Sequence, residues 1–141
     1  GCKSSADATI TSDKYAGGIV GNVYQDTKHY YTRSWVVGCA SESKIVAAKP
    51  ATMIGYSSSA TVTACWAVKN GANVIAAYGT PINEASFQYN AATDATQADI
   101  DAMNLAIEAF NNSLDNISID GTVGAVMLKR WALVNGVPVL Q

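Results

Sequence analysis

The segment that most restricts the fold is YAGGIVGNV, residues 15–23, in which two glycines precede an Ile-Val pair and a third follows it. Glycine-rich segments also form phosphate-binding loops, but this one lacks the lysine of GxxxxGK[ST] and does not match GxGxxG. The residues after it, 22–26, do not begin a helix. We therefore interpret Gly17, Gly18 and Gly21 as corners between short strands, where glycine reaches positive φ without steric cost.

A second copy of this pattern lies further along the chain. Residues 1–21 and residues 38–55 both begin Gly-Cys-x-Ser, and both carry an isoleucine in the middle, Ile10 and Ile45. Each copy closes on an apolar pair and a glycine, and in the second copy this glycine is Gly55. Self-similarity at a spacing of about 20–50 residues is typical of solenoids and arrays.

The two copies continue into a pair of matching tryptophan segments. Residues 32–35 read Thr-Arg-Ser-Trp and residues 63–66 read Thr-Ala-Cys-Trp. This match predicts that Trp35 and Trp66 hold equivalent positions in successive copies and are internal stacking residues. A degenerate third copy is predicted over residues 74–87, with Tyr78 in the place of Tyr56 and Phe87 in the place of Trp66.

The segments within each copy are short, β-branched and aromatic, and Gly, Ser, Asn and Asp interrupt them, so they are predicted to be strands. Short strands joined by glycine corners in successive similar coils form a β-helix, or β-solenoid, in which each coil buries its apolar positions on the next. We therefore expect a mainly β fold with β-solenoid coils over residues 1–90 and a C-terminal cap over residues 91–141, packed as one globular unit.

The pattern changes to helical spacing after residue 90. Thr96 and Asp99 are placed to form a capping box at a helix start. Apolar residues then recur every three or four positions, which predicts one α-helix over residues 96–114. We expect this helix to pack over the last coil and cover its strand edges, with Asn104 and Asn111 outside the apolar stripe. Its apolar positions are Ile100, Met103, Ile107, Phe110 and Leu114.

The chain ends in a hairpin signal. Asn135-Gly136 stands between the apolar runs of residues 131–134 and 137–140. An Asn-Gly pair in this setting predicts a two-residue type I′ turn between antiparallel strands. Pro138 restricts its strand to an edge, because proline cannot donate to a ladder.

These features resemble the GLUG-type repeats of large bacterial surface proteins, which read roughly GG-aliphatic-aliphatic-G and then a strand ending in Cys-aromatic-Ala. Residues 16–23, AGGIVGNV, match the first part, and residues 60–67, ATVTACWA, match the second. The second copy departs from the pattern, since Ala51-Thr52 replaces the double glycine. The helix followed by Trp, Asn-Gly-x-Pro-x-Leu also resembles the end of such arrays in Bacteroidetes. The resemblance covers residues 1–89.

The resemblance implies a cell-surface setting and no catalytic residues. GLUG-type arrays occur in surface lipoproteins and adhesin-like proteins, so an extracellular chain anchored at the outer membrane through other parts of a longer protein is expected. The Gly-Cys-x-Ser start falls partway through a repeat, which favours a piece of a longer array. The alternative is that Gly1 is not native and Cys2 lies near a lipoprotein start.

Composition and charge restrict the partners. Of the 141 residues, 49% are hydrophobic and only 14% are charged, against about 25% charged in ordinary domains, so disorder is not expected. The net charge of −2 with no basic run argues against a nucleic-acid partner. No apolar run approaches the roughly 20 residues of a membrane helix, so insertion of this segment into a membrane is not expected.

No catalytic or metal site is predicted, and no cofactor. The one histidine, His29, has no nucleophile motif around it, and Asp99 with Asp101 suits a first helical turn better than acid–base catalysis. The Asp-Asn and Asp-Gly turns after residue 114 lack the DxDxDG spacing of a calcium loop. The three cysteines form no CxxC and are expected to be free, partly buried thiols. Lys14, Lys44 and Lys49 are not expected to cluster.

Exposed tyrosines are the most suggestive surface feature. Tyr30, Tyr31, Tyr56 and Tyr78 are candidate exposed aromatics that could stack on sugar rings or on a protein partner. Tyr30 and Tyr31 are adjacent, so on a strand they point to opposite faces and one is exposed.

The residues are consistent with one main hypothesis for the function and with two alternatives. The first hypothesis is a non-enzymatic surface module, structural or adhesive, whose partner is a host or bacterial surface glycan or protein. The alternatives are a glycan-binding module and, less favoured, a β-helical polysaccharide-active enzyme, which needs clustered carboxylates or Lys/Arg on one face.

Overall fold

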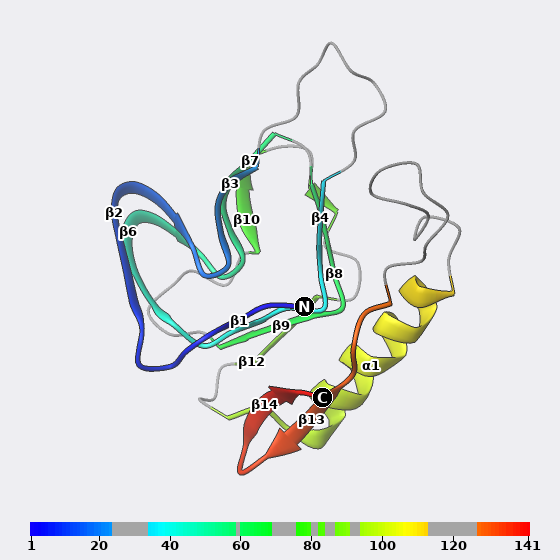
Figure 1. The fold of residues 1–141 in the computed structure, drawn as a ribbon. Coiled ribbons are helices and arrows are strands. Elements are labelled where there is room, and N and C mark those ends of the chain that lie inside the picture. The colour runs from blue at the N-terminus through cyan, green and yellow to red at the C-terminus, as the bar shows by residue number, and fades with distance from the viewer. Residues whose placement is uncertain are drawn as a thin grey trace.

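The computed structural model describes residues 1–23, 34–58, 60–68, 76–79, 82–83, 87–90, 94–112 and 127–141. Within these ranges the chain is mainly β with one α-helix and a C-terminal hairpin (Figure 1). The elements, in order, are β1 Lys3–Ser4, β2 Thr9–Gly17, β3 Val20–Val23, β4 Trp35–Val37, β5 Ala40–Ser41, β6 Lys44–Ala51, β7 Ile54–Ser57, β8 Ala60–Thr63, β9 Cys65–Val68, β10 Ala77–Gly79, β11 Ile82–Asn83, β12 Phe87–Asn90, α1 Gln97–Asn111, β13 Trp131–Val134 and β14 Val137–Leu140.

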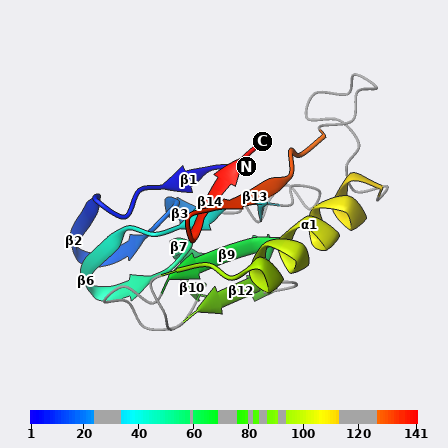
Figure 2. The same cartoon turned by 90° about the horizontal axis from the view of Figure 1, so that it is seen from below.

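All described strand pairs up to residue 90 are parallel. One four-stranded sheet has the order β1-β5-β9-β12, two three-stranded sheets have the orders β3-β7-β10 and β4-β8-β11, and β2 pairs with β6. Each sheet therefore takes its strands from successive segments of the chain, and Figures 1 and 2 show these strands lying one above another.

The register confirms the first repeat that the sequence predicts. Lys3 pairs with Ala40, which places Cys2 beside Cys39. Ile10 pairs with Ile45, and Val20 pairs with Ile54. Ala77 is the third-copy neighbour of Ile54. Apolar side chains of equivalent positions thus lie on one another from layer to layer.

The third copy follows the prediction in one strand and differs by one residue in another. Tyr78 pairs with Tyr56, as predicted. Phe87 pairs with Cys65 rather than with Trp66, so the last strand is shifted by one position from the predicted alignment. A shift of one residue changes which face of the sheet a side chain occupies.

The predicted equivalence of Trp35 and Trp66 is wrong. Trp35 lies on β4 and pairs with Thr61, whereas Trp66 lies on β9 and pairs with Ala40. The Thr-x-x-Trp match therefore joins two strands of different sheets. Trp66 points away from the space between the sheets, because its strand neighbours Cys65 and Ala67 belong to the core there and Trp66 belongs to the core beneath α1.

The prediction of glycine corners is wrong for Gly21 and Gly55, which lie within β3 and β7, and the predicted reason, a positive φ, is wrong for all four glycines. None of Gly17, Gly18, Gly21 and Gly55 has a positive φ. A Cβ on Gly17 would collide with the Gly55 backbone N and the Val20 carbonyl oxygen, and one on Gly18 with backbone and side chain of other strands. Gly21 has open space around its Cβ position. Close approach of neighbouring backbones therefore explains three of these glycines.

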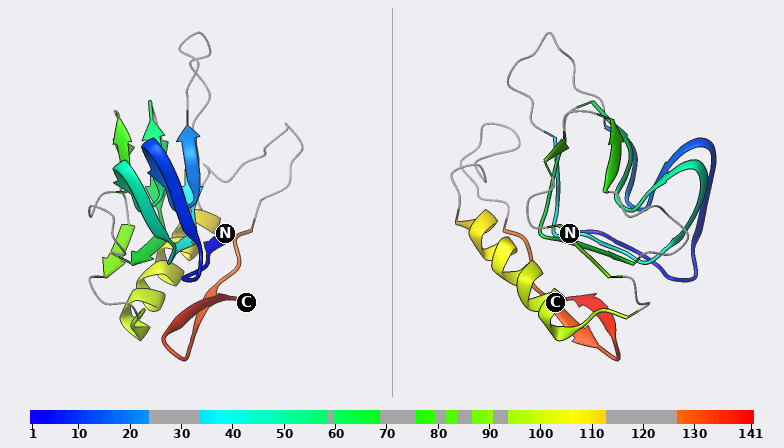
Figure 3. Two further views of the ribbon diagram at one scale, coloured as in Figure 1. Left: turned by 90° about the vertical axis from the view of Figure 1, so that its left-hand side faces the viewer. Right: turned by 180° about the vertical axis from the view of Figure 1, so that it is seen from behind.

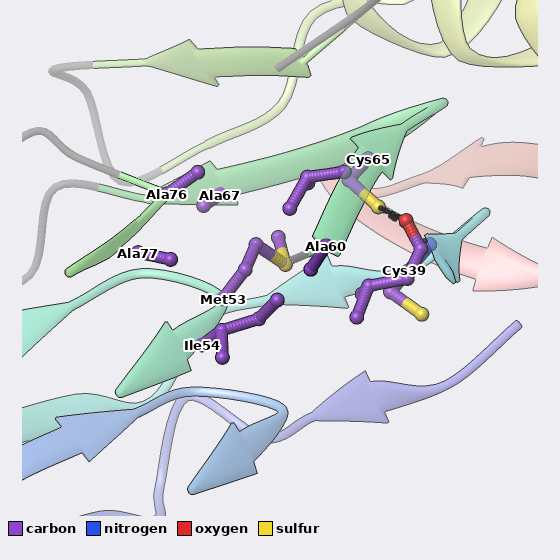
Figure 4. Close-up of a cluster of buried hydrophobic side chains, with 10 residues drawn as sticks. Cys39, Met53, Ile54, Ala60, Cys65, Ala67, Ala76 and Ala77 are labelled. Atoms are coloured by element: carbon purple, nitrogen blue, oxygen red, sulfur yellow. Dashed lines mark hydrogen bonds between the residues drawn. The ribbon is translucent and has the colours of Figure 1, made fainter. Parts of the chain in front are cut away.

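A first core lies between the sheets and joins side chains from three of them (Figure 4). Met53 and Ile54 come from the β3-β7-β10 side, Val62 from β8, and Cys65 from β9, and each is fully buried. Side chains of this size buried between parallel strands supply the apolar burial that holds the layers together.

A second core lies between the strands, α1 and the hairpin. Trp66, Ile100, Met103, Ile107 and Trp131 are all buried in it. Helix α1 spans Gln97–Asn111, slightly shorter than the predicted helix, and begins with the predicted capping box of Thr96 and Asp99.

The position of α1 differs from the prediction in one respect. The helix packs on side chains of successive layers, including Ala40 of β5 and Trp66 of β9, so it lies along the side of the stack (Figure 2). It does not simply cover the edge of the last layer. The apolar face of α1 contacts strands of more than one layer, and this packing holds the layers together.

Two helix positions predicted to face outward contact the chain instead, Asn104 at the first residue of β13 and Asn111 in the segment before it. Asn104 is buried, donates to the Trp131 carbonyl oxygen at 2.9 Å and accepts from the Trp131 N–H at 2.8 Å. Asn111, one heptad later, makes the same pair of bonds with Leu128 at 3.0 and 2.9 Å. These amides act as strand-like partners for a backbone that would otherwise be unpaired beside the helix.

The predicted C-terminal hairpin is confirmed. Strands β13 and β14 are antiparallel, with Val134 opposite Val137. Asn135 and Gly136 have φ of 51° and 77°, the positive values that a type I′ turn requires at both central residues. Lys3 donates to the Pro138 carbonyl oxygen at 2.9 Å, so the hairpin also contacts the first strand.

Candidate functional site: a groove of tyrosines and lysines

A bent arm formed by β2 and β6 creates the most distinctive surface of the molecule. The β2–β6 pairing shifts register between Ser12 and Tyr15, and the two strands turn there and run back toward Gly17 and Ala51. Figures 1 and 3 show the arm returning beside the β3-β7-β10 sheet. The close approach at Gly17 and Gly55 closes the bottom of this arrangement, because side chains there would push the two backbones apart.

Two ladders of equivalent residues face each other across the space between arm and sheet. On the arm, Tyr15 of β2 pairs with Lys49 of β6. On the sheet, Asn22 of β3 pairs with Tyr56 of β7, and Tyr56 pairs with Tyr78 of β10. The repeat therefore places aromatic and polar side chains at the same position of successive layers.

The Tyr15 ring contacts the rings of both Tyr56 and Tyr78. The Tyr15 ring centroid lies 5.1 Å from that of Tyr56 and 6.0 Å from that of Tyr78, with interplanar angles of 60° and 62°. Tilted and edge-to-face rings at such distances attract each other through their quadrupoles. Tyr15 and Tyr78 are half-buried, while Tyr56 is 37% exposed.

Two lysines complete the cluster. The ammonium groups of Lys14 and Lys49 lie 5.4 and 5.2 Å from the centroid of the Tyr15 ring, and that of Lys49 lies 5.9 Å from the Tyr78 centroid. Lys49 Nζ also donates to the Tyr15 hydroxyl oxygen at 3.4 Å. Cations within about 6 Å of a ring centroid are held by the ring electrons, which fixes these two charges over the aromatic surface.

An open groove of about 580 Å³ runs past these side chains. We call this groove, together with Lys49 and Tyr78 beside it, the tyrosine–lysine groove. Its lining as described contains no aspartate or glutamate, so its fixed charges are positive. The lining residues are Ser12, Lys14, Tyr15, Gly21, Asn22 and Tyr56.

The structure assembles some of the residues that the sequence singled out. Tyr56 and Tyr78 lie in the groove and retain exposed surface, while Tyr30 and Tyr31 lie outside the described residues. The expectation that the lysines do not cluster is wrong for Lys14 and Lys49, since both surround one ring.

Sequence reasoning missed Tyr15, which makes the most contacts in the groove. A signal was present: Tyr15 and Lys49 stand at equivalent distances before the closing glycines of the first two copies, and the alignment of those copies was correct. What the alignment lacked was the bend at Ser12–Tyr15, which turns this ladder toward the sheet.

The remaining candidate residues are the cysteines, the possible metal ligands and His29. Cys2, Cys39 and Cys65 are free thiols, the last two buried, as predicted. Among the described residues no group of three or more His, Cys, Asp or Glu side chains is placed to hold a metal ion. His29 lies outside the described residues. The described helix is not long and apolar enough to cross a membrane.

Comparisons with protein-family models, with curated proteins and with solved structures find no match to this chain.

Proposed function

We propose that the chain is a non-enzymatic module of a longer bacterial cell-surface protein, in which stacked β-solenoid coils present the tyrosine–lysine groove to an acidic glycan. The observation that carries this proposal is the groove itself: the Tyr15 ring contacts two further tyrosine rings, two ammonium groups lie over Tyr15, and the described lining holds no carboxylate. The surface setting rests on the resemblance to GLUG-type repeats.

The β-solenoid assignment is supported by the pairing of the strands. Parallel neighbours with a constant order in each sheet, and equivalent residues in register over two or three layers, are what successive coils produce. An experimental structure of the chain with antiparallel pairing or Greek-key connections before residue 90 would contradict it.

An acidic sugar suits the chemistry of the groove better than a neutral one. Tyrosine offers a flat apolar face for a sugar ring and a hydroxyl at its edge. Lys14 and Lys49 are exposed, and the ion pair found among the described residues joins Lys3 to Glu42 elsewhere. A uronate carboxylate would supply the anion that the two ammonium groups lack within the groove lining.

Binding of polygalacturonate tests the proposal, with methyl-esterified pectin as the matched uncharged ligand. We expect retention of the chain in affinity electrophoresis or by calorimetry with polygalacturonate, and weaker binding as salt is added, because exposed charges are screened. Lys49→Gln should lower affinity by up to about fivefold, as exposed ion pairs contribute about 0.2–1 kcal/mol. Tyr56→Ala should lower it as well.

Lys44→Gln is the matched control, since Lys44 is an exposed lysine of the same strand β6 that pairs with Thr9 outside the groove. Equal effects of Lys44→Gln and Lys49→Gln, or equal binding of both pectins, would show that the groove does not select an acidic glycan. Binding to a surface protein but to no polysaccharide would leave an adhesive module with a protein partner.

Polygalacturonate also distinguishes a binding module from the alternative, a polysaccharide-active enzyme. Lys49 and Tyr15 lie within hydrogen-bond distance, an arrangement that could also exchange a proton with a bound uronate. We expect no release of unsaturated oligosaccharides from polygalacturonate. Turnover that disappears in Tyr15→Phe would favour the polysaccharide-active enzyme instead.

A further inference from the structure

The three cysteines of the chain share one position in three successive strands. Lys3 pairs with Ala40, and Ala40 pairs with Trp66, so the residues just before them, Cys2, Cys39 and Cys65, are neighbours in the same sheet. The backbone confirms this, because the Ala40 N–H donates to the Cys2 carbonyl oxygen at 2.9 Å and the Trp66 N–H to that of Cys39 at 3.0 Å. We call these three residues the cysteine ladder.

The ladder runs from solvent into the core. Cys2 is exposed, whereas Cys39 is 4% and Cys65 0% exposed. The Cys39 N–H donates to the sulfur of Cys65 at 3.4 Å, and the two cysteines lie side by side in Figure 4. The Cys65 thiol also reaches the Val36 and Thr63 carbonyl oxygens at 3.4 and 3.2 Å. The innermost thiol is thus held in place by backbone groups.

The middle thiol, Cys39, lies 3.3 Å from the Val37 carbonyl oxygen and also contacts the Cys65 thiol, and the second of these contacts favours its thiolate. A hydrogen bond from the Cys65 thiol lowers the pKa of Cys39 to about 6 although burial opposes the shift. The Cys2 N–H and the Cys2 thiol act in the same direction. The same contact with Cys39, together with burial, raises the pKa of Cys65, so Cys65 keeps its proton and acts as the donor.

We propose that the cysteine ladder is a modification site for small-molecule disulfides, at which Cys2 and Cys39 become joined and cross-link the first two layers. In-register neighbours on parallel strands are about 4.8 Å apart, within the roughly 4.4–6.8 Å that separates Cα atoms across a disulfide. Cys65 is the positioning residue and keeps its free thiol.

The reaction proceeds by two exchanges. The exposed Cys2 thiolate attacks one sulfur of the external disulfide RSSR, forming Cys2–S–S–R and releasing RS⁻. The Cys39 thiolate then attacks the Cys2 sulfur, forming the Cys2–Cys39 bond and releasing the second RS⁻. Two protein thiols are oxidised, one external disulfide is reduced to two thiols, and the two protons pass to solvent or to the released thiolates.

Oxidised glutathione is the probe that tests the ladder. The purified chain is incubated with it, alkylated in denaturant and digested with trypsin, which places the three cysteines in separate peptides, residues 1–3, 34–44 and 45–69. We expect the first two peptides to be disulfide-linked and the third to carry an alkylated Cys65. A Cys39–Cys65 link, a disulfide between two chains, or alkylation of all three thiols would overturn the proposal.

Variants separate the two exchanges. Cys39→Ser should stop at glutathione attached to Cys2, and Cys2→Ser, at an exposed position that tolerates the change, should leave both remaining thiols free over the same time. Cys65→Ala should give the same product more slowly at pH 7, because the donor that stabilises the Cys39 thiolate is lost, while Cys65→Ser restores a donor and should recover most of the rate. A Cys2→Ser chain that still forms a disulfide at the original rate would contradict the order of attack.

Discussion

At Gly18 the backbone passes so close to β5 and to the link between β6 and β7 that hydrogen is the largest substituent the site accepts. A Cβ there would collide with the Ser41 hydroxyl oxygen and with the Thr52 carbonyl oxygen, and the second of these is backbone and cannot rotate away. Gly21, three residues later, has no atom within 4 Å of its Cβ position and no positive φ. Two glycines of one motif therefore have different physical roles.

We predict that Gly18→Ala lowers the free energy of unfolding by roughly 1–3 kcal/mol or more, as overpacking does in well-packed interiors. Gly21→Ala should be neutral or stabilise by up to about 1 kcal/mol, because it removes freedom from the unfolded chain at a site that accepts a side chain. Urea unfolding of both variants measures this. Equal losses in the two variants would mean that close approach is not what requires glycine at residue 18.

At the scale of elements, two asparagines of α1 bond to β13 and to the segment just before it, in addition to the apolar packing. Asn104 and Asn111 lie one heptad apart on the helix, and each exchanges two hydrogen bonds with one residue of the 128–131 segment. Trp131, the residue bonded to Asn104, inserts its ring into the second core and donates from Nε1 to the Gly38 carbonyl oxygen at 3.1 Å. The helix, the hairpin and the corner after β4 are thereby joined at one point.

Asn104→Ala is predicted to destabilise the chain by about 1–3 kcal/mol, since it leaves the buried N–H and carbonyl of Trp131 without these partners. Glu108→Ala is the matched control, an exposed position on the same helix, and should change stability by less than about 0.5 kcal/mol. Thermal unfolding followed by circular dichroism compares the two. A loss no greater than that of the control would show that water replaces the amide.

At the scale of the whole molecule, one strand, β9, lies between the two cores and contributes side chains to both. Trp66 is fully buried on β9, with Cys65 and Ala67 on the other face of the strand in the core between the sheets. Its indole nitrogen has no hydrogen-bond partner among the described residues, so its contribution comes from packing. Trp35 packs on Phe110 of α1 with ring centroids 5.6 Å apart, so both tryptophans serve the contact between strands and helix.

Replacing Trp66 by alanine should cost roughly 3–5 kcal/mol, as large-to-small core changes do. Because a domain of this size has only about 5–15 kcal/mol of stability, the variant should be close to unfolded, and its strands and helix should lose structure together. The measurement is a melt in which helix and strand signals are followed separately. An unchanged melting temperature with lost glycan binding would instead identify Trp66 as an exposed recognition residue.

The sequence by itself determined the strands, their layer-to-layer register in the first two copies, the capped helix and the hairpin. These features depend on local chemistry: β-branched runs between turn residues, a Thr-x-x-Asp cap, an Asn-Gly turn, and a repeat whose offset is readable from Ile10 with Ile45. Each of these features can be predicted without knowing which other part of the chain it contacts.

Only the tertiary structure decided how the Tyr15–Lys49 pair faces Tyr56 and Tyr78, and where the helix lies on the stacked strands. The bend between Ser12 and Tyr15 brings Tyr15 to Tyr56. Ser12 and Asp13 are residues that favour turns, but they do not show in which direction the strand continues after the bend. Trp35 and Trp66 look alike in sequence but belong to different sheets, since the spacing of the copies drifts along the chain. Which residues pair between layers depends on the lengths of all the strands and turns that lie between them. A cap or a hairpin depends on a few adjacent residues, whereas this pairing depends on the complete fold.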